Sequence, residues 1–320
     1  MALSDLTVYS ETAYAVMTEV LDQQIELFNA ATGGCIQLTS AALQGDFGSE
    51  AFYKKISGLV RRRNAYGTGT VAAKKLENLE DVKVKVAAGT PPIEINPSQF
   101  TWIQKSPEEA GAIIGQQLAG DAMSDMLNLA LGCGYAAISQ VSDCVLDITG
   151  VTAPGDVASF ASLTSGAGKF GDRSGDIAVW VMHSTPMTNL YLNAIANASM
   201  LFNYGTINVM RDPFGRLFVQ TDSANLVAST VYRILGLTPG AIIVEQNNDW
   251  IANTETSNGD ENITRTWQAE WTFNVAIKGF AWDISHGGKS PADAALLTST
   301  NWDRYSTSIK DLAGVVIKTH

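Results

Sequence analysis

An unbroken helical pattern over residues 106–141 constrains the fold of this chain more than any other sequence feature. It opens with Ser106, which can cap a helix, Pro107, which suits the first helical position, and Glu109, which can close a capping box. The apolar residues that follow include many pairs three to five residues apart, as on one face of a helix: Ile113, Ile114, Leu118, Met123, Met126, Leu127, Leu129 and Leu131. At ~1.5 Å per residue this helix would be about 50 Å long. We therefore predict a spine helix that is too long for the interior of a compact domain.

The same segment contains five glycines: Gly111, Gly115, Gly120, Gly132 and Gly134. Each costs roughly 1 kcal/mol of helix propensity relative to alanine. We expect them to mark the close approach of another backbone, or a bend or end of the helix near Gly132. Glu108, Asp121 and Asp125 interrupt the ~20 consecutive apolar residues that a transmembrane span needs, so no membrane partner is expected.

Composition and charge exclude several classes of protein. Of the 320 residues, 46% are hydrophobic and 17% are charged, which excludes a largely disordered chain, and the length suggests one to three domains. The formal net charge of −11 argues against a surface that grips nucleic acid electrostatically. No basic region followed by an apolar run opens the sequence, so no signal peptide is expected. Cys35, Cys133 and Cys144 form no Cys-x-x-Cys pair, which favours a reducing cytoplasm without disulfides.

Ahead of the spine, the pattern predicts a helix at 10–31, a short strand at 35–39 and a short helix at 50–59. The densest charge cluster of the chain follows at Arg61, Arg62 and Arg63. These arginines can lie in a solvated turn or pair with a nearby carboxylate of the same chain. Alternatively, they can form salt bridges to another subunit.

Strict alternation of apolar and polar residues then predicts two strands. Residues 82–86 and 93–95 alternate, and the residues between them suit a turn, so we predict a two-stranded ribbon. Lys83 and Lys85 would lie on its solvated face. Because an isolated ribbon is only marginally stable, we expect it to lean on something outside its own domain.

After the spine the elements alternate in type. The sequence predicts helices at 156–164, from His183 through Ile195, and from Ser290, and strands at 176–182, 206–210, 216–221, 242–244, 264–277, 279–284 and 314–317. The continuous apolar run at 176–182 is typical of a strand buried on both faces. Residues 212–215 suit a turn that carries Phe214, and residues 247–261 are polar and turn-prone.

The sequence contains no recognisable catalytic, cofactor or metal motif. Its three histidines are far apart, and no Cys/His cluster has metal-ligand spacing. His183 beside Ser184 could act as base and nucleophile, but capping of the following helix explains Ser184. The glycine-rich stretch at 165–171 lacks the spacing of a phosphate-binding loop. Four acidic residues do not match a calcium loop and suit a solvated loop: Asp249, Glu255, Asp260 and Glu261.

These features describe an acidic α+β protein with extended parts that lack a core of their own, as in an assembling structural subunit. The order of the elements resembles that of major capsid proteins of tailed bacteriophages, whose shell-forming fold is named after phage Hong Kong 97. The shared order is an N-terminal arm, a hairpin extension at about 62–103 and a spine helix beginning at Ser106. The sequence at 179–184, before a predicted helix, and the sequence at 289–317 also resemble the corresponding segments of many such proteins.

The resemblance covers nearly the whole chain and implies a Hong Kong 97-like fold with peripheral and axial domains. Residues 1–60 would form the N-terminal arm and 61–105 the extended hairpin, called the E-loop. Residues 106–152 and 250–320 would form the peripheral domain with the spine helix at 106–141, and 153–249 would form mainly the axial domain. The arm and the E-loop would lie across the neighbouring subunit.

The implied function is that of a non-enzymatic major capsid protein. It would self-assemble into pentamers and hexamers of an icosahedral head that encloses double-stranded DNA without sequence specificity. Members of this family that carry their own scaffold have a long helical extension ahead of the E-loop. Because the E-loop begins here as early as residue 61, a separate scaffolding protein is expected. A portal protein is expected as well, and a decoration protein is an open alternative. The expected location is the virion capsid, assembled in the host bacterial cytoplasm. The expected intersubunit contacts are Arg61, Arg62, Arg63, Lys83, Lys85 and Phe214.

Three alternatives remain open from the sequence. Another phage structural protein, such as a decoration or tail-tube subunit, would lack a long spine helix. An encapsulin-like compartment shell would share the fold and enclose a cargo enzyme instead of DNA. An enzyme with an unrecognised site is the third alternative, with His183 as its first candidate residue.

Overall fold

The computed structural model describes residues 3–40, 45, 47–53, 60–75, 78–95, 107–153, 155–192, 199–204, 207–211, 217–247, 249–258 and 263–320. Its α-helices are α1 (Leu3–Ala31), α3 (Pro107–Ser139), α4 (Phe160–Ala167), α5 (Ser184–Leu192), α6 (Ile284–Gly287) and α7 (Asp293–Leu296).

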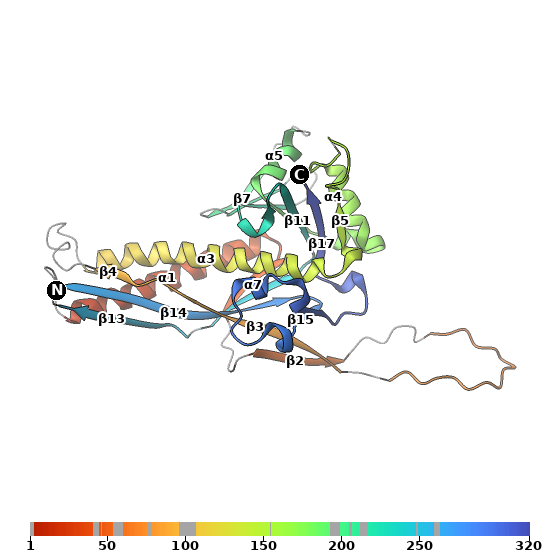
Figure 1. Ribbon diagram of the computed structural model, residues 1–320, viewed down its shortest axis with the longest axis horizontal. Helices are drawn as coiled ribbons and strands as arrows, with labels where there is room; N and C mark the ends of the chain where they lie inside the picture. The colour runs from red at the N-terminus through yellow and green to blue at the C-terminus, as the bar shows by residue number, and fades with distance from the viewer. Residues whose placement is uncertain are drawn as a thin grey trace.

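The predicted spine is helix α3, which has 33 residues and runs along the long axis of the molecule (Figure 1). Helix α1 lies alongside it and confirms the helix predicted at 10–31. A Cβ atom at Gly115 would lie 2.6 Å from the Ala13 carbonyl oxygen of α1, so this glycine permits the close backbone approach that the sequence predicted. Beyond Gly132, α3 continues to Ser139, and its last turns are almost entirely buried.

A first sheet lies beside α1 and α3 and is organised around one long strand. Within the described residues it has nine strands: β1 (Ile36–Ser40), β2 (Phe47–Tyr53), β3 (Asn78–Gly89), β4 (Ile93–Ile95), β12 (Ile242–Gln246), β13 (Ile251–Ser257), β14 (Thr264–Ile277), β15 (Phe280–Trp282) and β16 (Trp302–Arg304). Strand β14 pairs with β12, β15, β13, β3 and β4. Its apolar residues Trp267, Trp271 and Phe273 alternate with polar ones, which confirms the strand predicted there.

The predicted ribbon is wrong in its pairing, although both of its strands exist. β3 and β4 do not pair with each other; they lie one after the other along the same edge of β14. The antiparallel partner of β3 is instead β2, where Phe47 pairs with Val84 and Tyr53 with Asn78. Residues 50–53 are therefore strand and not the start of the predicted helix at 50–59, of which the remainder lies outside the described residues.

The polar stretch at 247–261 also differs from the prediction. Seven of its residues form β13, which pairs with β14 from Ile251 opposite Glu270 to Ser257 opposite Thr264. The pair forms a long antiparallel hairpin at the end of the molecule where the N-terminus lies (Figure 1).

A second sheet stands above the carboxyl end of α3 in Figure 1. In the described part of the chain it has eight strands: β5 (Val145–Asp147), β6 (Val179–Met182), β7 (Ser199–Tyr204), β8 (Ile207–Arg211), β9 (Leu217–Thr221), β10 (Val227–Ala228), β11 (Val231–Leu237) and β17 (Gly314–Thr319). All four residues of β6 are buried, which confirms the strand predicted to be covered on both faces. β17 lies between β5 and β11, so the C-terminal strand joins a sheet supplied mostly by residues 153–249.

Both sheets share one hydrophobic core with α3. The guanidinium carbon of Arg233, on β11, lies 4.0 Å from the centre of the Tyr135 ring on α3. Asn225 donates a hydrogen bond of 2.9 Å to the Asn128 carbonyl oxygen of the same helix. The spine therefore joins the two sheets, while the division into arm, E-loop, peripheral and axial domains stays a prediction.

Candidate intersubunit surfaces

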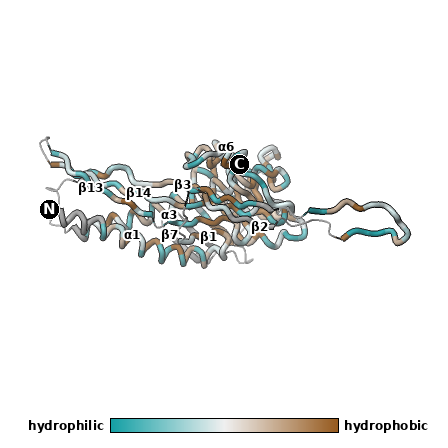
Figure 2. The backbone as a smooth tube through the Cα atoms, turned by 90° about the horizontal axis from the view of Figure 1, so that it is seen from below, coloured by the Kyte–Doolittle hydropathy of each residue, from teal (hydrophilic) through white to brown (hydrophobic). Residues whose placement is uncertain are grey.

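The most exposed part of the described chain is the loop between β2 and β3, of which residues 60–75 are described; we call these residues the basic loop. All of them are exposed, and the loop projects from the body at one end of the long axis (Figures 1 and 2). At its tip, Gly67 N–H donates to the Asn64 carbonyl oxygen at 3.2 Å, and Tyr66 N–H donates to Asn64 Oδ1 at 3.0 Å. These bonds form a turn that presents the Tyr66 side chain, 95% exposed.

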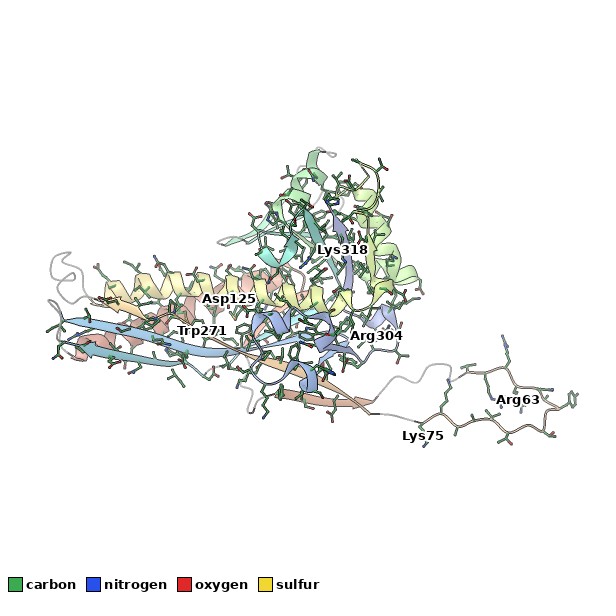
Figure 3. All side chains as sticks on the ribbon, in the orientation of Figure 1. Arg63, Lys75, Asp125, Trp271, Arg304 and Lys318 are labelled. Atoms are coloured by element: carbon green, nitrogen blue, oxygen red, sulfur yellow. The ribbon has the colours of Figure 1, made fainter. Side chains whose placement is uncertain are left out.

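The charge of the basic loop is opposite to that of the rest of the chain. It carries five basic residues, Arg61, Arg62, Arg63, Lys74 and Lys75, and no Asp or Glu. Arg63 and Lys75 are labelled on the projecting segment in Figure 3. The rest of the chain contains 16 Lys and Arg residues and 32 Asp and Glu residues. Because a long loop without packing of its own is usually functional, a basic loop on an acidic protein indicates an acidic partner surface.

The other predicted contact residues have different surroundings. Lys83 forms an ion pair of 2.7 Å with Glu245 of its own chain, and its side chain is only 16% exposed, so the predicted solvated face is partly covered here. Lys85 is half-buried, and its Nζ lies 3.5 Å from the Gly45 carbonyl oxygen. Phe214 lies outside the described residues. The structure gathers the three arginines on the basic loop and keeps the two lysines on β3; their intersubunit contacts stay a prediction.

A second exposed surface lies on the β13–β14 hairpin, and sequence reasoning missed it. The side chains of one face are Ile251, Asn253 and Glu255 on β13 and Thr266, Gln268 and Glu270 on β14; with Glu94 of β4, which pairs with Thr266, we call them the hairpin face. Most of them are exposed, whereas Trp267, Ala269 and Trp271 on the opposite face are buried. The only sequence signal for this face is the alternation within 264–277, because β13 itself is polar.

A hollow of about 550 Å³ adjoins the hairpin face. It is lined by the small residues Ala87 and Gly89 at the end of β3 and by Asp249, Ile251 and Glu270, among others. The Asp249 carboxylate accepts a hydrogen bond of 2.9 Å from the Thr272 amide, which fixes the turn into β13. A groove of about 240 Å³ continues from the hollow along the hairpin face. Both are lined by carboxylates, and no Lys or Arg lines either one in the described part of the chain.

An aromatic cluster supports the hairpin from its buried side. The ring of Trp250 stacks on Trp271, with 5.4 Å between centroids, and lies 5.2 Å from the ring of Tyr14 on α1. Trp250 thereby joins the base of the hairpin to α1, and Trp267 lies 6.3 Å from it. The hairpin face is therefore carried by packed elements rather than by a loop.

The strongest candidate for catalysis in the sequence, His183 beside Ser184, is used to begin a helix. His183 Nδ1 accepts a hydrogen bond of 3.2 Å from the Thr185 amide and lies 3.3 Å from Ser184 Oγ. Asp222 lies 3.5 Å from His183 Nε2 and accepts a hydrogen bond from the Ser184 amide at 3.2 Å. These bonds satisfy free amide groups in the first turn of α5, so capping explains the arrangement without a nucleophile.

Other reactive groups are isolated. Burial raises the pKa of the Cys35 and Cys144 thiols to about 11 and raises that of Cys133 as well. The described residues contain no group of three His, Cys, Asp or Glu side chains that could hold a metal ion. None of the described helices is long and apolar enough to cross a membrane.

Comparison with known proteins gives a family match and several structural neighbours. A family model described as Gp13-like, major capsid protein 13-like, matches residues 5–316. Among solved structures, the chain is similar to the capsid of Ralstonia phage GP4, with a TM-score of 0.50 and 10% identity over 89% of this chain and 87% of that chain. A structure from Microbacterium phage Oxtober96 gives a TM-score of 0.48 and 12% identity, covering 90% of each chain. The capsid of cyanophage Pam1 gives 0.46 and 14%, covering 76% and 84%. At 10% identity, the likeness to the Ralstonia phage GP4 capsid concerns the fold alone. A search of curated proteins finds no match.

Proposed function

This chain belongs to the Gp13-like family of major capsid proteins, and from that premise we propose that it assembles with copies of itself into the pentamers and hexamers of an icosahedral tailed-phage head. The family match over residues 5–316 is the observation that carries the function. The chain is accordingly a structural protein of the capsid shell, with the Hong Kong 97-like fold that its element order resembles. A non-enzymatic role agrees with the use of His183 and Ser184 as a helix cap.

The shape of the molecule supports assembly from head to tail. The basic loop lies at one end of the long axis, and the β13–β14 hairpin and the N-terminus lie at the other (Figure 1). A contact between two different surfaces of identical subunits closes into a ring when the rotation between neighbours allows it. Rings of five and six subunits need only small differences in this rotation.

Electron microscopy of the purified protein in negative stain tests the proposal, with and without co-expression of a candidate scaffolding protein. We expect closed angular shells, or rings of five and six subunits. A monomer or dimer under both conditions would overturn the proposal.

The further partners follow from the same proposal. A separate scaffolding protein would direct assembly in the host bacterial cytoplasm, a portal protein would occupy one vertex, and the shell would enclose double-stranded DNA without reading its sequence. The net charge of −11 supports the part of the proposal that concerns DNA. A basic inner surface would bind phosphates through counterion release and restrict the movement of the DNA, whereas an acidic one would not. We expect no retardation of double-stranded DNA by purified shells at physiological salt. Strong, salt-sensitive retardation would contradict this part of the proposal.

A further inference from the structure

A hollow of about 280 Å³ lies between α1 and the first sheet, beside the aromatic cluster; we call it the α1 hollow. Tyr14, Thr18 and Asp22 line it from α1, because a spacing of four residues places them on one face of the helix. The other lining residues come from the ends of β1 and β12, the base of the hairpin and β14: Ser40, Gln246, Asn247, Trp250 and Trp271. The hollow is thus formed within a single chain by packed elements.

Three aromatic rings give the α1 hollow an affinity for positive charge. Trp250 and Trp271 form an offset stack, with 5.4 Å between centroids and 16° between planes, and the Tyr14 ring lies 5.2 Å from that of Trp250. All three residues line the hollow. The face of an aromatic ring attracts a cation within about 6 Å of its centre, most strongly in tryptophan. The rings therefore favour a cationic group over a neutral group of the same size.

The charges around the α1 hollow act in the same direction. Asp22 is exposed and supplies a carboxylate at its edge. The 29 residues of α1 include five Asp and Glu and no Lys or Arg. Among the described residues that line the hollow there is no Lys or Arg either. An anionic ligand is accordingly disfavoured.

The lining also separates an organic cation from a metal ion. Ca²⁺ takes about six to eight oxygen ligands, and Mg²⁺ keeps several of its waters. The α1 hollow instead combines one carboxylate with three aromatic side chains. Its volume lies just below the range of roughly 300–1,000 Å³ that is usual for drug-sized ligands. An alkylammonium group, which is weakly hydrated and of side-chain size, fits both the chemistry and the volume.

We propose that the α1 hollow binds an alkylammonium group, held by the rings of Trp250 and Tyr14 and by the Asp22 carboxylate. The inference goes beyond the proposed function, because this site needs neither a shell nor a second copy of the chain. The group belongs either to a free amine or to a lysine side chain of a partner protein.

Calorimetric titration of the purified protein with choline tests the site, and the neutral isostere 3,3-dimethylbutan-1-ol is the matched ligand. We expect saturable binding of choline and at least tenfold weaker binding of the alcohol, because the two differ in charge and hardly in shape. Equal affinities, or no saturable binding of choline, would overturn the inference.

Two variants on α1 test the role of the carboxylate. D22N should weaken choline binding about fivefold. E26Q removes the same charge from an exposed position of α1 that does not line the hollow, and it should leave binding unchanged. Equal effects of D22N and E26Q would contradict a contact with Asp22 and reduce the effect to the net charge of the helix.

Two further variants test the rings and the position of the site. Y14L removes a ring and keeps an apolar side chain, so we expect at least fivefold weaker choline binding. T18K places an ammonium group of the chain itself on the same face of α1 and should abolish binding by occupying the hollow. Urea unfolding of both variants establishes that they are folded. Unchanged choline binding in a folded Y14L or T18K would refute the α1 hollow as the site.

The source of the group is distinguished by two ligands that share a primary ammonium. Tighter binding of n-butylammonium supports a free amine, and tighter binding of N-acetyl-lysine amide supports a lysine of a partner protein. Saturable binding of neither would overturn the inference. Shell formation by D22N and Y14L, followed by negative-stain microscopy, keeps this outcome separate from that of the proposed function.

Discussion

At the scale of single residues, Gly115 is the clearest case of a side chain excluded by a neighbouring backbone. A Cβ atom there would meet the Ala13 carbonyl oxygen at 2.6 Å, well inside contact distance. We expect G115A to lower the free energy of unfolding by roughly 1–3 kcal/mol, although helix propensity alone would favour alanine by about 1 kcal/mol. Gly168, in right-handed helical conformation with no atom within 4 Å of its Cβ position, is the control, and G168A should be neutral or slightly stabilising in urea unfolding. Equal effects of the two substitutions would contradict the close approach of α1.

Asp222 shows a residue-scale effect that depends on pH. Hydrogen bonding from Ser184, together with a smaller electrostatic attraction to His183, holds the pKa of the Asp222 carboxyl below its ordinary value. Desolvation acts in the opposite direction and only partly offsets this lowering. The stabilisation is therefore present above about pH 4, the ordinary value of an Asp, and is lost as the pH falls through the lowered pKa. Because the side chain is 58% exposed, we expect D222N to cost less than about 1 kcal/mol. Urea unfolding should show this difference at pH 7 and a smaller one near pH 3; a difference that grew on acidification would contradict the assignment.

At the scale of elements, the hairpin depends on the aromatic cluster at its base. Trp250 stacks on Trp271 and contacts Tyr14, so W250A removes the packing between β14 and α1. We expect a loss of about 3 kcal/mol in the free energy of unfolding. The adjacent I251A changes a side chain that is 68% exposed and should cost less than about 0.5 kcal/mol. Similar costs for the two variants would mean that Trp250 does not join the hairpin to α1.

The sequence predicted the elements whose signal is local. The spine and β6 were found because apolar spacing and a continuous apolar run identify a helix and a buried strand without knowledge of their partners. Pairing was not predictable in the same way: alternation identified β3 and β4 as strands but could not show that both lie along β14. β13 was missed because one of its edges and one face are solvated, so its residues are mostly polar.

The candidate surfaces also differ in whether a local sequence signal could predict them. The arginine cluster was visible in the sequence because its three residues are consecutive. Glu94, Glu255 and Glu270 come from three strands, and only the register of β4 and β13 on β14 brings them to one face. Lys83 was expected to be solvated, yet Glu245, distant in sequence, pairs with it at 2.7 Å.

At the scale of the whole molecule, folding and assembly are expected to depend on different residues. The basic loop is exposed throughout and contributes nothing to the shared core, so R61Q/R62Q/R63Q should change the free energy of unfolding by less than about 0.5 kcal/mol. The same variant should lose assembly, because each copy would lose three of the five positive charges that it presents to an acidic neighbour. R304Q is no equivalent control, since Arg304 holds its own chain through bonds to the Ser306 and Thr307 carbonyl oxygens. R61K/R62K/R63K is the matched variant, as it keeps the charge and removes only the planar guanidinium groups.

Salt separates the two kinds of stability further. Exposed charges are screened beyond roughly 10 Å at 0.1 M salt and beyond about 3 Å at 1 M, whereas burial of apolar residues is not weakened by screening. Assembly of the unmodified protein, followed by light scattering, should therefore fall as salt rises from 0.1 to 1 M while the unfolding midpoint of the monomer stays nearly constant. The shell yield of R61K/R62K/R63K should lie between that of the unmodified protein and that of R61Q/R62Q/R63Q. Assembly that is equally strong in high salt, or intact in R61Q/R62Q/R63Q, would contradict this prediction. Apolar contacts would then hold the subunits together, and the charge of the basic loop would have no role in assembly.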